Sequence, residues 1–194
     1  ILTAITVVSG LLLGAVYGVT KEPIAAAQEN TKQEAFRAVM ADASEFVTYE
    51  DFDAESASAL LSDNGYTSDS ISEVAVAQDA GGETIGYVIN VTSSEAYDGE
   101  LQLSVGIASD GTVKGVEMLS ISETAGLGMK ADEAEFKDQF KDKNVAQFSY
   151  TKTGEEGDDK IDAISGATIT TNAVTNAVNS ALVYFQNELG GGAE

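Results

Sequence analysis

The sequence contains no cysteine and no histidine among its 194 residues. The absence of cysteine excludes disulfides, thiolate nucleophiles and Cys-ligated iron–sulfur clusters. The absence of histidine removes the usual zinc ligands and the Ser-His-Asp type of nucleophilic machinery. A chain so poor in groups that titrate near neutral pH is not expected to make and break bonds with its own side chains. If it takes part in redox chemistry, a bound cofactor must supply that chemistry.

Positive charge is also scarce. Ten Lys and Arg residues stand against 32 Asp and Glu residues, which gives a net charge of -22. Such a surface repels nucleic acid and anionic lipid headgroups, so we expect no nucleic-acid partner. The apolar fraction of 43% is enough for a hydrophobic core. The length allows one ordinary domain plus an appendage.

Residues 1–20 contain no charged side chain. As a helix they would extend roughly 30 Å, the thickness of the hydrocarbon core of a bilayer. We therefore predict a single transmembrane anchor over 1–20, in contact with membrane lipid. A cleaved signal peptide is the alternative, although its apolar region is usually shorter. Gly10, Gly14 and Gly18 repeat every four residues, a spacing that favours close packing against other transmembrane helices.

A second helical pattern follows the apolar segment. Residues 21–43 place apolar side chains at helical spacing, and Pro23 lies near the start, where proline is tolerated. We predict a connecting helix over 21–43 and a folded domain over 44–194.

The middle of the chain is rich in Val, Ile, Leu and Tyr, which favours β-strands. Gly81-Gly82 and Asp110-Gly111 supply hairpin turns between neighbouring segments. A short amphipathic helix is expected over Asp132–Lys143, a further strand near Phe148–Lys152, and a long helix after Thr168. The predicted fold class is α+β, with an antiparallel sheet that has one face covered by helices. The four predicted strands are Ile71–Gln78, Thr84–Thr92, Glu100–Ala108 and Thr112–Leu119.

The segment Asp162-Ala163-Ile164-Ser165-Gly166-Ala167-Thr168 stands directly before that last helix. Small residues around a glycine allow a tight turn and a close approach to a bulky group. The free N–H groups and the positive dipole end of a helix start favour a phosphate. An ordinary helix cap with small residues for close packing is the alternative. The hydroxyls before or within the first turn belong to Ser165, Thr168, Thr170 and Thr171.

The segment 162–168 resembles the flavinylation motif of two FMN-binding proteins, the G subunit of the Rnf complex and the C subunit of the sodium-pumping NADH:quinone reductase. The resemblance implies that Thr168 carries FMN through a phosphoester bond made by a separate flavin transferase. It also implies that Ser165, Gly166 and Ala167 shape the turn. Asp162 would belong to the signal that the transferase reads.

A second loop, Ser122–Lys130, contains two glycines separated by a leucine. It resembles the E-T-P-G-L-G loop of the same family, with Ala125 in place of the proline. The resemblance implies that this loop lines the flavin site. Leu127 would give apolar contact to the ring and Thr124 a hydrogen bond to a polar edge. The residues expected to border the ring are Glu123, Thr124, Leu127 and Gly128.

Two further features have competing interpretations. Tyr97 and Gly99 loosely resemble an aromatic–glycine loop that approaches the flavin in this family, but a surface turn is the favoured interpretation. Lys160 either pairs with carboxylates of the acidic segment before it or neutralises the FMN phosphate, and pairing is favoured.

The resemblance implies a flavin-carrying electron-transfer subunit of an ion-translocating ferredoxin:NAD⁺ oxidoreductase (Rnf) complex, working during Na⁺ or H⁺ transport. Its expected partners are the other membrane subunits and the flavin transferase. Its expected location is the cytoplasmic membrane, with the soluble domain on the extracellular or periplasmic side. The alternatives are the C subunit of the quinone reductase, a membrane-anchored extracellular flavoprotein, and a flavin-free binding module.

Overall fold

The computed structural model describes residues 2–190, and the chain divides into two units, Ile1–Glu34 and Ala35–Glu194. Helix α1 (Leu2–Val39) makes up the first unit and contributes its last turn to the second. By length and composition α1 is able to cross a membrane, and its most apolar stretch is not buried within the protein. The predicted anchor and the predicted connecting helix are therefore continuous in the described chain, as one helix over Leu2–Val39.

Helix α1 differs from its prediction in two details. It ends at Val39 rather than Ala43, because the next strand begins at Glu45. Pro23 lies inside the helix and not near a helix start, so its nitrogen donates no hydrogen bond to the preceding turn.

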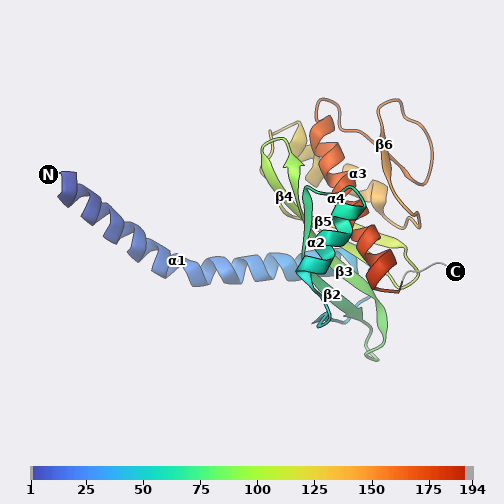
Figure 1. The fold of residues 1–194 in the computed structure, drawn as a ribbon, viewed down its shortest axis with the longest axis horizontal. Helices are drawn as coiled ribbons and strands as arrows, with labels where there is room; N and C mark the ends of the chain where they lie inside the picture. Colours follow the sequence, from blue (N-terminus) through green and yellow to red (C-terminus); the bar gives the residue numbers. More distant parts are fainter. Residues whose placement is uncertain (1, 191–194) are drawn as a thin grey trace. The chain divides into compact units, whose positions relative to one another are not determined.

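The second unit contains a five-stranded antiparallel sheet in the order β1-β2-β3-β4-β5, so that each strand pairs with its neighbour in sequence (Figure 1). The four predicted strands are confirmed, and the predicted glycine turns connect two of the pairs. The strands are β1 (Glu45–Thr48), β2 (Asp69–Gln78), β3 (Thr84–Ala96), β4 (Gly99–Ala108) and β5 (Val113–Ser120).

Helix α4 (Thr168–Glu188) lies across one face of this sheet and packs mainly on β3 (Figure 1). Helix α2 (Ala54–Asp63) packs beside it on β2. The inward side chains of β4 show the clearest pattern, because Leu101, Leu103, Val105 and Ile107 are completely buried. They join the apolar face of α4 in the main core.

The opposite face of the sheet carries a contact that the sequence did not indicate. A second core cluster forms there between the sheet and the end of α1, with Phe36, Val39 and Met40 packed on Val88. Gly106 makes this contact possible, since a Cβ atom at its position would collide with the Val39 carbonyl oxygen. Both faces of the sheet are therefore covered in part.

The segment after β5 is made of short elements. In place of one helix over 132–143 the structure has two short elements, α3 (Ala134–Lys137) and η2 (Asp138–Phe140), and they are preceded by η1 (Gly128–Asp132). Phe136 and Phe140 are buried, as predicted. The strand predicted near 148–152 is β6 (Ser149–Thr151), and it pairs in parallel with β7 (Lys160–Asp162), which the sequence did not indicate.

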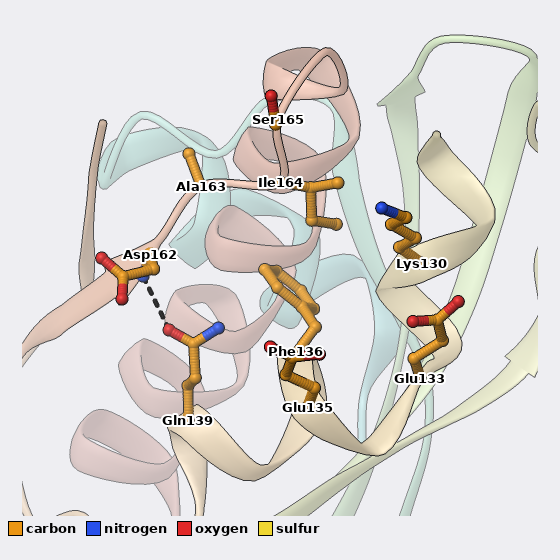
Figure 2. Close-up of a pocket in the computed structure, with 9 residues that line it drawn as sticks. All are labelled: Lys130, Glu133, Glu135, Phe136, Gln139, Asp162, Ala163, Ile164 and Ser165. Carbon is orange, nitrogen blue, oxygen red and sulfur yellow. Dashed lines mark hydrogen bonds between the residues drawn. The ribbon is translucent and has the colours of Figure 1, made fainter. Parts of the chain in front are cut away.

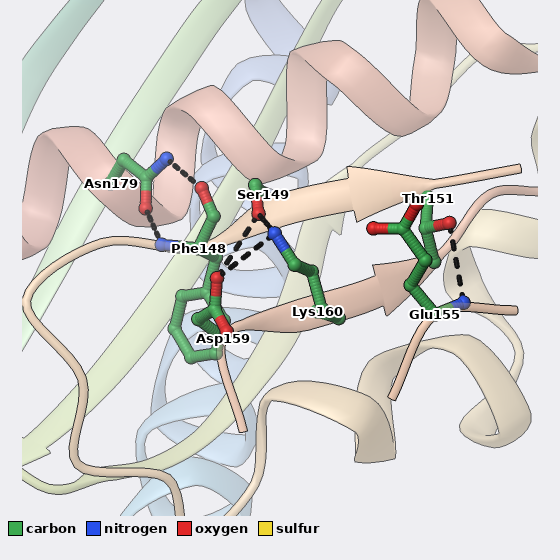
Figure 3. Close-up of polar contacts among 7 residues, drawn as sticks. All are labelled: Phe148, Ser149, Thr151, Glu155, Asp159, Lys160 and Asn179. Carbon is green, nitrogen blue, oxygen red and sulfur yellow. Dashed lines mark hydrogen bonds and ion pairs between the residues drawn. The ribbon is translucent and has the colours of Figure 1, made fainter. Parts of the chain in front are cut away.

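Asn179 of α4 holds the start of β6 against the helix (Figure 3). Its side chain accepts a hydrogen bond from the Phe148 N–H at 2.7 Å and donates one to the Phe148 carbonyl oxygen at 2.9 Å. Strand β7 pairs with β6 and leads directly into residues 162–168.

Candidate functional site

The turn before α4 has the tight geometry that the small residues predict. Gly166 adopts a φ of +79°, a conformation that side chains with a Cβ rarely adopt. The residue that precedes the helix is Ala167, and no side chain caps the helix start. The alternative interpretation, in which a Ser or Thr side chain caps the start of α4, is therefore not supported. The first N–H groups of α4 are left without a side-chain acceptor, which is the arrangement that suits an anion.

A cavity of about 440 Å³ lies against this helix start. Three parts of the chain line it, namely the β3–β4 turn, the loop after β5 and the first turn of α4. Three of its side chains are large, apolar and substantially exposed: Tyr97 (70%), Leu127 (42%) and Ile169 (52%). The full lining consists of Tyr97, Glu123, Thr124, Leu127, Gly128, Gly166, Ala167, Thr168, Ile169 and Thr170.

The hydroxyl groups around the helix start are not equivalent. Thr171 Oγ1 donates to the Ala167 carbonyl oxygen and accepts from the Ile164 N–H. Thr170 Oγ1 donates to the Glu123 carboxylate at 3.0 Å. In the described part of the chain, the Thr168 hydroxyl has no hydrogen-bond partner, and Thr168 is only half-buried on the cavity wall. Of the three hydroxyls in the first turn of α4, that of Thr168 is therefore the one that remains available for modification.

The two predicted motifs contact each other directly. A Cβ atom at Gly166 would lie 3.1 Å from Leu127 Cδ2, so Leu127 packs on the glycine of the turn. Gly126 adopts a φ of +76° and has open space around it, so glycine is favoured at this position by the backbone conformation and not by close packing. Gly128 is different, because a Cβ atom there would lie 2.6 Å from Glu123 Oε2. The second glycine of the loop thus makes room for a carboxylate of the protein itself.

Asp162 and Ser165 lie elsewhere. They line a separate cavity of about 220 Å³ on the side of the η1–α3 segment, together with Lys130 and Gln139 (Figure 2). The Asp162 N–H donates to Gln139 Oε1 at 2.7 Å. Of the nine predicted site residues, seven line the 440 Å³ cavity: Glu123, Thr124, Leu127, Gly128, Gly166, Ala167 and Thr168.

Three residues of the lining were not in the predicted set. Tyr97 does lie in the β3–β4 turn, as the favoured interpretation had it, but it also faces the cavity. Ile169 is an exposed apolar residue in the first turn of α4, outside the buried face of that helix. Its position outside the apolar periodicity of the helix is visible in the sequence and could have indicated a binding role. Thr170 was considered only as one hydroxyl among four.

The charges at the site are negative or absent. Among the described residues that line the 440 Å³ cavity, none is Lys or Arg and Glu123 is the one charged side chain. Lys160 is engaged elsewhere, since its Nζ atom lies 3.3 Å from Asp159 Oδ2 and donates to Ser149 Oγ at 2.8 Å (Figure 3). The predicted pairing of Lys160 with the acidic segment is confirmed. The hydrogen bond from Lys160 lowers the pKa of Asp159.

Comparison with known proteins identifies this region. Residues 96–183 match the family model described as "FMN-binding domain". The chain shares its fold with the crystal structure of the C subunit of the Na(+)-translocating NADH-quinone reductase from Parabacteroides distasonis. The TM-score is 0.53 and the identity 24%, over 74% of this chain and 77% of that one.

Three curated relatives have higher sequence identity, and each is the G subunit of an ion-translocating oxidoreductase complex. That of the ion-translocating oxidoreductase complex of Methanosarcina acetivorans is 33% identical, over 97% of this chain and 93% of the relative. That of the proton-translocating ferredoxin:NAD(+) oxidoreductase complex of Clostridium ljungdahlii is 30% identical, over 98% and 91%. The Na(+)-translocating counterpart of Acetobacterium woodii is 38% identical, but the match spans about half of each protein, 55% and 52%. The chain belongs to the family of the G subunits of ion-translocating oxidoreductase complexes.

Proposed function

We propose that this chain is the flavin-carrying electron-transfer subunit of an ion-translocating ferredoxin:NAD⁺ oxidoreductase complex, with FMN attached covalently to Thr168 through a phosphoester. The observation that carries the proposal is the Thr168 hydroxyl, which is without a hydrogen-bond partner in the described chain and lies on the wall of the cavity. The neighbouring hydroxyls of Thr170 and Thr171 are bonded within the protein. The FMN-binding family match and the G-subunit relatives support the identity of the cofactor.

The residues of the cavity fit FMN in size and in chemistry. Ligand cavities of this kind usually measure about 300–1,000 Å³ and have mostly apolar walls. Tyr97, Leu127 and Ile169 would contact the apolar faces of the flavin ring, and Thr124 would donate a hydrogen bond to a polar edge. When bound, FMN supplies the capacity to exchange one or two electrons, which no side chain of this protein has.

A covalent bond would keep FMN attached to a chain whose negative charge disfavours binding of a phosphate. The cavity offers no Lys or Arg to hold a phosphate, and the net charge of -22 repels one. The N–H groups at the start of α4 offset the phosphate charge only in part. A phosphoester to Thr168 removes dissociation altogether. Because the chain has no His or Cys to activate the hydroxyl, a separate flavin transferase is needed as a maturation partner.

Helix α1 would anchor the protein in the cytoplasmic membrane as a single transmembrane segment over 1–20, with 21–43 as its connection to the FMN-binding domain over 44–194. The face formed by Gly10, Gly14 and Gly18 is open and would dock against other membrane subunits of the complex. The soluble domain would lie on the extracellular or periplasmic side. The coupling ion differs between the names of the relatives, Na⁺ in one and the proton in another.

The attachment is tested by denaturing electrophoresis of the full chain, produced in its native host, under ultraviolet light. The wild-type band is expected to fluoresce and the Thr168→Ala band to stay dark. Thr170→Val is the matched control, because it removes a hydroxyl from the same wall that is already bonded to Glu123. The Thr170→Val band is expected to fluoresce. Fluorescence of the Thr168→Ala band would place the flavin elsewhere, and a dark wild-type band would refute the proposal.

The orientation is tested with one introduced thiol. Because the chain has no cysteine, Ser62→Cys on the exposed side of α2 gives a single labelling position in the soluble domain. A membrane-impermeant maleimide is expected to label it in intact cells. Labelling only after the membrane is opened would place the domain in the cytoplasm.

The match in fold to the C subunit of the quinone reductase supports a second candidate, membership of that enzyme. It is the weaker one, because the relatives with the higher identities, 33% and 30%, are G subunits aligned over more than nine-tenths of their length. Purification in mild detergent and identification of the accompanying subunits separates the two complexes. It also separates both from a stand-alone flavoprotein, which would be recovered without partners.

A further inference from the structure

Glu123 joins two of the segments that line the 440 Å³ cavity. Its Oε1 atom accepts a hydrogen bond from the Tyr97 N–H at 2.9 Å, in the β3–β4 turn. The same atom accepts from Thr170 Oγ1 at 3.0 Å, in the first turn of α4. The resemblance of the loop predicted that Glu123 borders the flavin ring. In the structure, Glu123 lines the cavity, and its carboxylate also accepts hydrogen bonds from two other parts of the lining.

The packing around Gly128 keeps this carboxylate in place. A Cβ atom at Gly128 would lie 2.6 Å from Glu123 Oε2 and 2.8 Å from Thr170 Oγ1. Real Cβ atoms essentially never approach other atoms that closely, so the carboxylate and the hydroxyl both lie directly over the glycine. Glycine at position 128 therefore makes room for the position that the Glu123 carboxylate takes.

We propose that Glu123 is the positioning residue of this cavity: it holds Tyr97 and the first turn of α4 at a fixed separation, and its negative charge lowers the reduction potential of the flavin bound there. The second half of this statement rests on the proposed function. The first half concerns the protein alone and holds with or without flavin.

The electrostatic half follows from the composition of the wall. Glu123 is the one charged side chain among the described residues that line the cavity. Reduction adds negative charge to the ring, and a fixed carboxylate nearby makes that addition less favourable. The effect is larger in a partly apolar cavity than in water, because the effective dielectric constant is lower.

The positional half is tested on the flavin-free Thr168→Ala chain by hydrogen exchange of the Tyr97 amide. Glu123→Ala removes the acceptor and is expected to speed exchange on the order of tenfold or more, since a hydrogen bond to a charged acceptor is among the stronger ones. Glu123→Gln keeps an oxygen acceptor at the same place, and it is expected to protect the amide far better than the alanine variant. Equal exchange in Glu123→Ala and the parent chain would overturn the positional role.

The electrostatic half is tested by redox titration of the flavin-loaded full chain. Glu123→Gln is expected to shift the midpoint potential to a more positive value. Glu83→Gln is the control, because Glu83 is exposed in the β2–β3 turn at the opposite end of β3, and it removes the same formal charge. This control is expected to leave the potential unchanged. An unchanged or more negative potential in Glu123→Gln would overturn the electrostatic half.

The two failures are distinguishable. If the wild-type chain carries no flavin, the proposed function and the electrostatic half fall together. The exchange of the Tyr97 amide in the flavin-free chain still decides the positional half in that case.

Discussion

The first turn of α4 and the middle of the same helix both carry polar side chains, but they use them differently. In the middle, Asn176 donates to Glu95, Asn179 makes two hydrogen bonds to the Phe148 backbone, and Ser180 donates to Asp69. In the first turn, the Thr168 hydroxyl faces a cavity and has no partner among the described residues.

The difference separates polar residues that stabilise the fold from those available for chemistry. Burying a polar group costs free energy unless it forms a hydrogen bond, which explains why the middle of α4 is fully bonded to the strands and loops around it. A free hydroxyl at the exposed end of the same helix costs little. Changes in the middle of α4 should therefore alter stability, and changes at Thr168 should alter flavin content.

The largest stability effect is expected from Asn179→Ala. This change leaves the N–H and the carbonyl oxygen of buried Phe148 without partners, at a cost of about 2–4 kcal/mol. Denaturant unfolding measures the loss. The matched control is Asn187→Ala, which removes only an exposed bond to its own helix and should change stability little. If folded Asn179→Ala protein lost its covalent flavin, the middle of α4 would affect flavin content as well as stability, and this would contradict the comparison.

A smaller loss of stability is expected from Gly128→Ala. The new methyl group would collide with the Glu123 carboxylate and the Thr170 hydroxyl, at a cost of about 1–3 kcal/mol, and it should displace both. Gly126→Ala is the comparison, because its cost comes from a strained φ of +76° with open space around it. Faster exchange of the Tyr97 amide is expected in Gly128→Ala and not in Gly126→Ala. The reverse order would contradict the packing around Glu123.

The smallest effect on stability is expected from Asp69→Asn, a change in β2 where the side chain of Asp69 accepts a hydrogen bond from Ser180 of α4. Burial raises the pKa of Asp69, hydrogen bonds from Ser93 and Ser180 oppose the rise, and the charge of Glu95 adds to it. Its Oδ1 atom is buried without a hydrogen-bond partner among the described residues. Asp69→Asn, which cannot ionise, is therefore expected to raise the free energy of unfolding at neutral pH by about 1 kcal/mol.

The sign of the pH dependence follows from the raised pKa of Asp69. Between the ordinary pKa of an aspartate and the raised value, the folded protein binds more protons at this position than the unfolded chain does. Stability from this group is therefore full below the ordinary value and is lost as the pH rises through the raised one. Denaturant unfolding across this range should show a shallower fall in Asp69→Asn than in the wild type. Parallel curves would exclude Asp69 as the source.

Much of the fold was predictable from local patterns. The four long strands, the buried phenylalanines and α4 follow from periodicity, because each element buries one face against a large core. Strand β1 was missed because it has four mostly exposed residues at the sheet edge, where no apolar alternation is required. Strand β7 was missed because three residues are too few to show a period. Its pairing partner, β6, begins next to Phe148, whose backbone is bonded to Asn179 of α4, and this is a tertiary contact that local patterns do not reveal.

The candidate site was predictable where small residues and glycines constrain the backbone, as at Gly166 and Thr168. The role of Glu123 was not, because its partners Tyr97 and Thr170 are 26 and 47 residues away in sequence. The separation of Asp162 and Ser165 from the larger cavity also depends on tertiary structure, since the turn at Gly166 directs the two halves of the motif to different sides.

The most direct measurement is the mass of the intact protein from its native host, followed by the mass of the peptide that contains Thr168. The account predicts an increase over the amino-acid mass of one FMN less one water, located on Thr168. An intact mass equal to that of the amino acids alone would contradict it, because the chain would then carry no covalent flavin.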